Sequence, residues 1–120
     1  MAVRTENFSF VRGDTFSQNI TICNCLEDLT EIYFTVKETY EDKNPVIQKT
    51  LKTGGITFLE ATDTETKYNI LINATDTDLM KVDTEYLYDL ELVAGTIKKT
   101  VLKGTITLEA DVTRTINEVV

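Results

Sequence analysis

Apolar and polar residues alternate with a period of two along most of this chain, which is the pattern of strands that bury one face. Five stretches show it most clearly, at residues 15–22, 32–37, 68–72, 86–92 and 97–109. The residues expected to face the core are Phe16, Ile20, Ile22, Ile32, Phe34, Val36, Tyr68, Ile70, Ile72, Tyr86, Tyr88, Leu90, Leu92, Gly104, Ile106 and Leu108. Lys37, Asp89 and Lys103 alternate with them and are therefore expected to face outward.

Shorter patterns add further strands and turns. Residues 7–11 predict a strand with Phe8 and Phe10 inward. Ala94-Gly95 predicts a tight hairpin between two of the long strands. The last of these strands is long, and Gly104 is expected to bend it or to form a bulge.

Residues 46–51 and 56–59 predict a further hairpin, with Thr53-Gly54-Gly55 as its turn. The helical signal lies at residues 75–80. Thr75 is followed three residues later by Asp78, which resembles a capping box. One or two helical turns are expected there, crossing between strands.

Seven or eight short strands with one short helical crossover predict an all-β domain, and an immunoglobulin-like β-sandwich is the leading architecture. A small closed barrel shows the same alternation, so the pattern leaves sandwich and barrel open. At 120 residues the chain has the length of one domain, and a single domain is expected over residues 1–120. Residues 111–120 have no hairpin partner and are expected to be a frayed, mobile end or a docking strand.

The net charge of −8 opposes nucleic-acid binding, which depends on clustered Lys and Arg. It also opposes binding to anionic lipid surfaces, so neither nucleic acid nor membrane is expected as a partner. The N-terminus has no long apolar run, so no signal peptide is predicted and synthesis in a cytoplasm is expected.

Cys23 and Cys25 are the two cysteines of the chain. On an extended strand their side chains would point to opposite faces, so both are expected to be reduced thiols. The chain has no His and no third Cys, so a zinc site is not expected, and no cofactor is predicted.

Catalysis is not predicted, because the chain lacks His and carries no nucleophile-elbow or nucleotide-binding motif. A hydrolase that uses paired carboxylates remains a distant third hypothesis. Arg12-Gly13-Asp14 matches an adhesion tripeptide, but its place between two strands is typical of an ordinary turn.

The sequence leaves two classes of ligand possible, calcium and carbohydrate. The loop carboxylates are either a calcium site or solvated surface charges; they are Asp63, Glu65, Asp76, Asp78, Asp83 and Glu85. Tyr33 and Tyr40 fall on no inward face and are available to bind carbohydrate.

The segment Phe10-Val11-Arg12-Gly13-Asp14-Thr15-Phe16 resembles the start of a tailed-bacteriophage family, the N-terminal domain of the baseplate upper protein and its stand-alone phage relatives. Tyr86-Leu87-Tyr88-Asp89-Leu90-Glu91-Leu92 is similar to the Tyr/Asp-rich strand of this family. Further blocks similar to the family follow in its order, at residues 28–30, 33–37, 47–49, 54–56, 74–79, 104–108 and 111–114.

This resemblance implies an immunoglobulin-like structural module of a phage tail or baseplate, found in the virion. It also implies homo-oligomeric packing and contacts with other phage structural proteins. The receptor-directed regions of the larger family members have no counterpart here, so a scaffold role fits better than host recognition.

Two functions are therefore carried forward: a non-enzymatic assembly module, and a free-standing β-sandwich that binds carbohydrate or calcium. For the first, turns and termini are the expected contact segments. The candidate contact residues are Arg12, Gly13, Asp14, Val112, Arg114, Ile116, Val119 and Val120.

Overall fold

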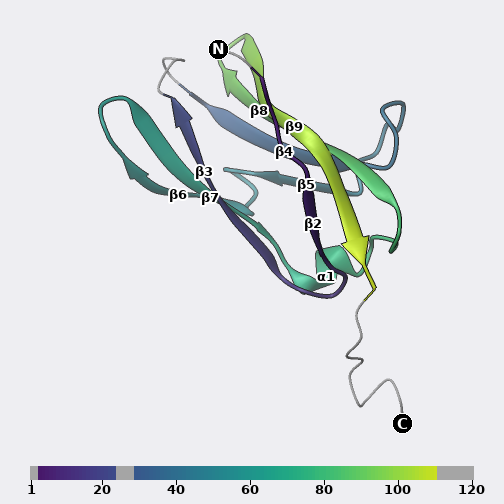
Figure 1. Ribbon diagram of the computed structural model, residues 1–120. Helices are drawn as coiled ribbons and strands as arrows, with labels where there is room; N and C mark the ends of the chain where they lie inside the picture. The colour runs from purple at the N-terminus through teal and green to yellow at the C-terminus, as the bar shows by residue number, and fades with distance from the viewer. Residues whose placement is uncertain (1–2, 24–28, 111–120) are drawn as a thin grey trace.

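Two β-sheets packed face to face make up the protein (Figure 1), in a computed structural model that describes residues 3–23 and 29–110. The larger sheet contains β1 (Arg4–Thr5), β2 (Phe8–Val11), β4 (Glu31–Lys37), β5 (Ile47–Thr50), β8 (Glu85–Ala94) and β9 (Ile97–Glu109). The smaller sheet contains β3 (Phe16–Cys23), β6 (Ile56–Ala61) and β7 (Glu65–Ile72). The helix α1 (Ala74–Thr77) connects β7 to β8, as a short crossover was predicted to do.

Strand order identifies the architecture. The larger sheet runs β1-β9-β8-β4-β5, with β2 also paired to β9, and the smaller sheet runs β3-β7-β6. β1 and β2 lie parallel to β9, while the other pairs are antiparallel. Two separate sheets exclude a closed barrel, and this strand order is that of an immunoglobulin-like β-sandwich. The predicted fold class is confirmed.

The core lies between the sheets and contains the inward positions that the alternation predicted, together with Ile47, Ile56, Met80 and Leu102. Every apolar residue of that predicted set is buried except Phe16, which is partly buried against the others. Phe8 and Phe10 also face inward, and Phe16 packs on both rings at centroid distances of 5.3 and 4.6 Å. The strands therefore form because alternate residues can leave water together.

Tyr86 occupies a position typical of immunoglobulin-like domains. It lies at the start of β8, is 1% exposed, and its hydroxyl accepts a 2.7 Å hydrogen bond from the backbone N–H of Lys81. This is the arrangement of the tyrosine corner. Two residues later, where antibody domains carry a disulfide cysteine, Tyr88 packs on Phe34 of β4 at 5.4 Å. Aromatic packing thus fills the centre of this core.

The expected hairpin between residues 46–51 and 56–59 is wrong. β5 pairs with β4 in the larger sheet, and β6 pairs with β7 in the smaller one. The glycines at 54 and 55 carry the chain across from one sheet to the other, both with positive φ. A turn signal fixes where a strand ends, but strand pairing depends on which sheet can bury each face.

The capping box exists, but it begins two residues earlier than predicted. The side chain of Asn73 accepts from the N–H of Asp76 at 3.1 Å, and Asp76 accepts from the N–H of Asn73 at 3.1 Å. The predicted cap, Thr75, lies inside the helix. Asn73 directly follows β7, so the strand end decides where the helix begins.

Gly104 has a different role from the one predicted. The register shift of β8 and β9 lies between Leu90 and Glu91 and leaves Val101, not Gly104, as the extra residue. A Cβ at Gly104 would overlap the carbonyl oxygen of Glu6 and lie 2.8 Å from its carbonyl carbon. The glycine therefore allows the N-terminal segment to lie close against β9.

Cys23 closes β3 and is disulfide-bonded, so the expectation of a reduced thiol there is wrong. That expectation assumed an extended strand through Cys25, whereas β3 ends at Cys23. Cys25 lies outside the described residues.

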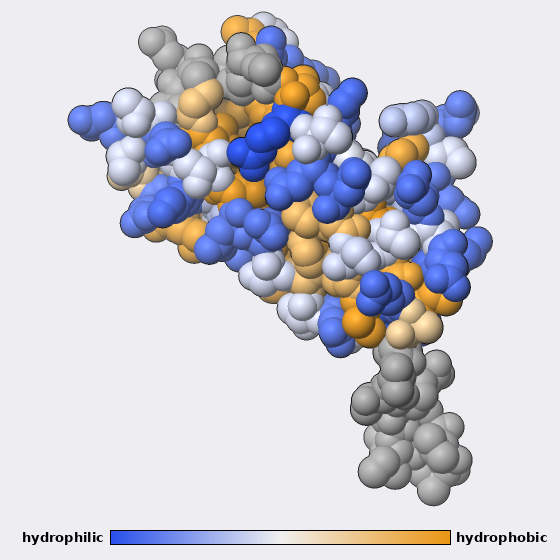
Figure 2. All heavy atoms as spheres, viewed as in Figure 1, coloured by the Kyte–Doolittle hydropathy of each residue, from blue (hydrophilic) through white to orange (hydrophobic). Residues whose placement is uncertain are grey.

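The sandwich opens slightly along one edge. In Figure 2, apolar side chains come to the surface in a band among polar ones, where β3 faces the edge formed by β1 and β9. A cleft of about 150 Å³ lies there, lined by Ile20, Ile22, Leu90 and Leu102 among others. Within the described ranges, no helix is long and apolar enough to cross a membrane.

Candidate functional site

The outer face of the larger sheet is hollowed into a groove of about 830 Å³. Its floor consists of outward side chains from β4, β5, β8 and β9. They include Thr35, Lys37, Gln48, Leu87, Asp89 and Lys103. A groove of this size is within the range of ligand pockets, about 300–1,000 Å³, so it fits a short segment and not a whole sheet face.

Strand register brings the floor residues together. Asp89 in β8 lies directly opposite Lys103 of β9 on one side and Thr35 of β4 on the other. Directly opposite side chains on one face of a sheet are close enough to interact. Three strands that are distant in sequence therefore meet at Asp89.

The first rim of the groove is the N-terminal segment. Asn7 accepts from the N–H of Thr105 at 3.0 Å through its side-chain oxygen, and Glu6 donates its N–H to the carbonyl of Lys103 at 2.9 Å. The Tyr88 hydroxyl donates to the Glu6 carbonyl at 2.6 Å. Burial of this hydroxyl and the nearby Glu6 carboxylate strongly raise the pKa of Tyr88. It stays protonated and holds the rim in place.

The second rim is the loop between β4 and β5, which contributes Tyr40, Lys43 and Pro45. The carboxylate of Asp42 accepts from the backbone N–H of Thr39 at 3.0 Å and from its hydroxyl at 2.9 Å. These hydrogen bonds favour the ionised carboxylate and lower the pKa of Asp42.

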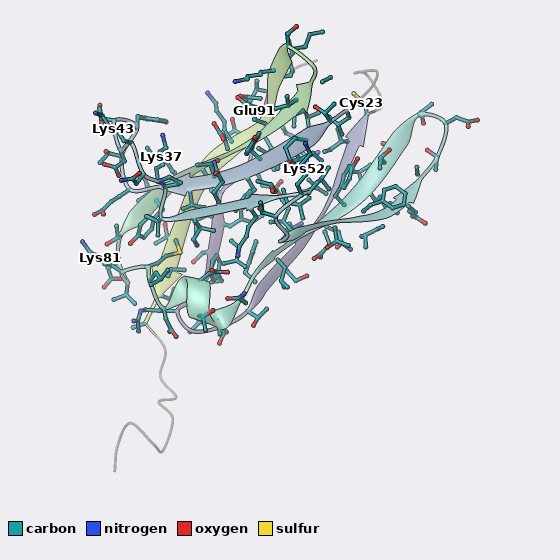
Figure 3. All side chains as sticks on the ribbon, turned by 180° about the vertical axis from the view of Figure 1, so that it is seen from behind. Cys23, Lys37, Lys43, Lys52, Lys81 and Glu91 are labelled. Atoms are coloured by element: carbon teal, nitrogen blue, oxygen red, sulfur yellow. The ribbon has the colours of Figure 1, made fainter. Side chains whose placement is uncertain are left out.

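The groove differs electrostatically from the rest of the molecule. Three lysines against two carboxylates, Asp89 and Glu91, give its lining a net charge of +1, whereas the chain as a whole carries −8. Lys37, Lys43 and Lys103 form no ion pair within the described part of the chain. Figure 3 shows Lys37 and Lys43 together at one side of the molecule.

Asp89 is the half-buried charge of the floor. Burial raises the pKa of its carboxyl, the nearby Glu91 carboxylate raises it further, and Lys37 acts in the opposite direction. A charge held partly out of water in a groove is a feature of binding sites. The groove therefore contains hydrogen-bond donors, the lysine ammonium groups, and an acceptor, the Asp89 carboxylate.

The predicted contact turn is largely engaged within the molecule. Arg12 donates from Nε to the carbonyl of Met80 and from Nη2 to the carbonyl of Asp78, both at 3.0 Å. Gly13 donates its N–H to Thr77 Oγ1 at 3.0 Å. Asp14 is exposed. This turn ties β2 and β3 to the end of α1, and its role in protein contacts stays a prediction.

The other predicted contact residues are Val112, Arg114, Ile116, Val119 and Val120. They lie outside the described residues.

The loop carboxylates do not gather in one place. Asp76 instead forms an ion pair with Lys49 at 2.7 Å and caps α1. Among the described residues, no group of three potential ligands is arranged to hold a metal ion. Of the two tyrosines predicted to be displayed, Tyr40 is 79% exposed at the groove rim, and Tyr33 is half-buried on the outer face of β4.

No protein-family model matches the chain, and no curated protein matches it either. Solved structures give low scores. Against a VGSC beta subunit from a study of multimeric cell-adhesive interactions, identity is 12% and the TM-score 0.47, over 89% of this chain and 92% of that one. An extracellular fragment of novel immune-type receptor 11 from Ictalurus punctatus gives 14% identity and a TM-score of 0.37, over 98% of this chain and 92% of that one.

The extracellular domain of the voltage-gated sodium channel beta4 subunit, described as a parallel homodimer, gives 11% identity and a TM-score of 0.43, over 93% of this chain and 97% of that one. At such scores these likenesses carry no functional argument. The fold assignment rests on strand order and register.

The sequence contained part of the signal for the groove. Alternation put Lys37, Asp89 and Lys103 on outward faces, but nothing in it showed that β4 and β9 flank β8. The two rims depend on Gly104 and on the loop after β4, whose local patterns predict a bend and a turn but no cavity. The groove was therefore missed.

Proposed function

We propose that this chain is a non-enzymatic structural module of a phage tail or baseplate, and that it binds neighbouring proteins through the groove. The observation that carries the proposal is the groove itself, in which Lys37, Lys43 and Lys103 converge from three different elements without ion-pair partners. The family resemblance of the sequence and the immunoglobulin-like fold support the same function.

The groove suits a protein segment for electrostatic reasons. Lysines in ion pairs must give up those ion pairs on binding, whereas Lys37, Lys43 and Lys103 have no ion pair in the described residues to break when they meet carboxylates. Complementary charges of this kind speed up encounter and select the partner. The partly buried Asp89 adds an acceptor for a backbone N–H of the bound segment.

The virion role is tested on particles. Tailed particles purified from the strain that carries the gene are digested and analysed by mass spectrometry. Peptides of this chain at a stoichiometry comparable to known tail proteins are expected, with immunogold label on the tail. Particles that are intact but free of the chain would overturn the proposal.

The contact face is tested with charge reversal. Lys37→Glu with Lys103→Glu is expected to remove the chain from particles, because two of the three groove lysines become negative. Lys52→Glu is the matched control, since Lys52 is exposed and lies outside the groove. Equal incorporation of the wild type, the double variant and Lys52→Glu would exclude the groove as the contact face.

Carbohydrate binding is the second candidate function, and one observation favours it. Tyr40 is exposed on the groove rim, and the polar side chains of Gln48 and Asn7 line the same groove; an aromatic ring together with polar groups suits a sugar. A glycan that binds the native state raises the melting temperature. A rise that Tyr40→Ala abolishes would support this function, and flat responses across a glycan panel would exclude it.

A further inference from the structure

We infer that the groove receives the β6–β7 turn of a second copy of this chain, so that copies join head to tail. This inference rests on the proposed function, since it names the occupant of the same groove. Charge, exposure and the positions of the two surfaces on the molecule all favour this occupant.

The β6–β7 turn is the acidic counterpart of the groove. Asp63 and Glu65 are exposed at the turn, and Glu60 lies at the end of β6 in an ion pair with Lys67 at 3.1 Å. Three carboxylates against one lysine give this turn a net charge of −2. The groove lining has the opposite sign, +1, in a molecule whose charge otherwise makes two copies repel.

The turn is ordered before it binds. Thr62 donates its N–H to the carbonyl of Glu65 at 2.7 Å, and the hydroxyl of Thr62 accepts from the N–H of Glu65 at 3.1 Å. A segment held in one conformation loses little entropy when it enters a partner. The turn is also short, as a groove of about 830 Å³ requires.

Apolar side chains lie beside the acidic turn. Phe58 and Leu59 of β6 are 55% and 46% exposed, although they are large and apolar. β6 is also the edge strand of the smaller sheet. In the head-to-tail pair, these side chains meet the groove rim at Tyr40 and Pro45, so that an apolar contact accompanies the charged one.

The two surfaces lie on opposite sides of the molecule. The β6–β7 hairpin projects at one side in Figures 1 and 3, and Lys37 and Lys43 lie at the other. One copy therefore cannot fill its own groove, and each copy offers one turn and one groove. Such a head-to-tail contact produces a ring or a filament, according to the rotation between copies.

Charge exchange between two variants tests this contact. The groove variant carries Lys37→Glu and Lys103→Glu, and the turn variant carries Asp63→Lys and Glu65→Lys. Each variant alone places like charges at every contact and is expected to remain monomeric. A mixture of the two restores opposite charges at every contact and is expected to associate, as is one chain that carries all four changes.

The measurement is molar mass by size-exclusion chromatography with light scattering, over roughly micromolar to millimolar protein. Wild type and Lys52→Glu are expected to form oligomers that both charge variants lose. A monomeric wild type over the whole range overturns the inference, as does a mixture that stays monomeric. Melting temperatures near that of the wild type confirm that the variants are folded.

This result is separable from the virion experiment. If the chain is monomeric but is incorporated into particles through its groove, the occupant is a different protein and only the head-to-tail inference fails. If the chain forms head-to-tail oligomers but is absent from particles, the proposed phage function fails and the contact stands.

Discussion

Asp89 is the residue whose charge depends most on its place in the groove. Its carboxyl is half-buried, and burial together with Glu91 raises its pKa above the usual 3.8. Asp42, by contrast, has its pKa lowered by hydrogen bonds from the backbone N–H and the hydroxyl of Thr39. The two residues are therefore expected to affect stability with opposite pH dependence.

Asp89→Asn tests this directly. A carboxyl with a raised folded-state pKa stabilises the fold only at low pH, and this contribution is lost as pH rises through that pKa. The melting temperature of Asp89→Asn minus that of wild type is therefore expected to increase from about pH 3 to about pH 7. Asp42→Asn is the control, whose difference should decrease over the same range. If the two melting-temperature differences changed in the same direction with pH, the opposite pKa shifts of Asp89 and Asp42 would be contradicted.

Arg12 links the turn after β2 to the end of α1. Arg12→Ala removes hydrogen bonds to the carbonyls of Asp78 and Met80 and is expected to lower the free energy of unfolding by about 1–3 kcal/mol. Denaturant unfolding measures this. Arg4→Ala is the control, because its ion pair with Glu6 is exposed and contributes only about 0–1 kcal/mol. Equal losses would show that the Arg12 contacts do not stabilise the fold.

At the scale of elements, the N-terminal segment depends on a gap in the side chains of β9. β1 and β2 both pair with β9 along the same edge, and the Glu6 carbonyl between them lies close against Gly104. The same segment forms one rim of the groove. A change at this one position is therefore expected to alter both stability and binding.

Gly104→Ala is expected to displace the Glu6 carbonyl and break its 2.6 Å hydrogen bond from Tyr88. The cost is about 1–3 kcal/mol, as is usual for an overpacked site. Thr107→Ala, on the outer face of the same strand, should change stability by less than about 0.5 kcal/mol. Faster hydrogen exchange at Glu6 and Thr105 is expected in the glycine variant only. Unchanged exchange there would mean that the segment adapts without loss.

At the scale of the whole molecule, charge decides how copies approach one another. The chain carries −8, yet the groove lining carries +1 and lies away from the acidic β6–β7 turn. Exposed charges are screened within about 10 Å at 0.1 M salt. Association through the groove is therefore expected to weaken as the salt concentration rises.

Added salt is expected to dissociate the oligomer while the melting temperature of the monomer changes little. From about 0.05 to about 0.5 M sodium chloride, the molar mass should fall towards 13.6 kDa. Sodium chloride screens the lysine and carboxylate contacts, but it leaves the apolar core unaffected. A mass that rises with salt would show that apolar contacts, such as those of Phe58, dominate instead.

The sequence determined the elements of this protein. Alternation is local, so the strands, the inward set and the short helix could be predicted within a few residues, and with them an all-β domain, whereas the choice of sandwich over closed barrel needed the two separate sheets. The tertiary structure decided what is not local: β5 joins β4 and not β6, the first strands lie parallel to the last, and the Glu6 carbonyl packs against Gly104. The groove follows from these pairings, because Lys37, Asp89 and Lys103 become neighbours only when β4, β8 and β9 lie side by side.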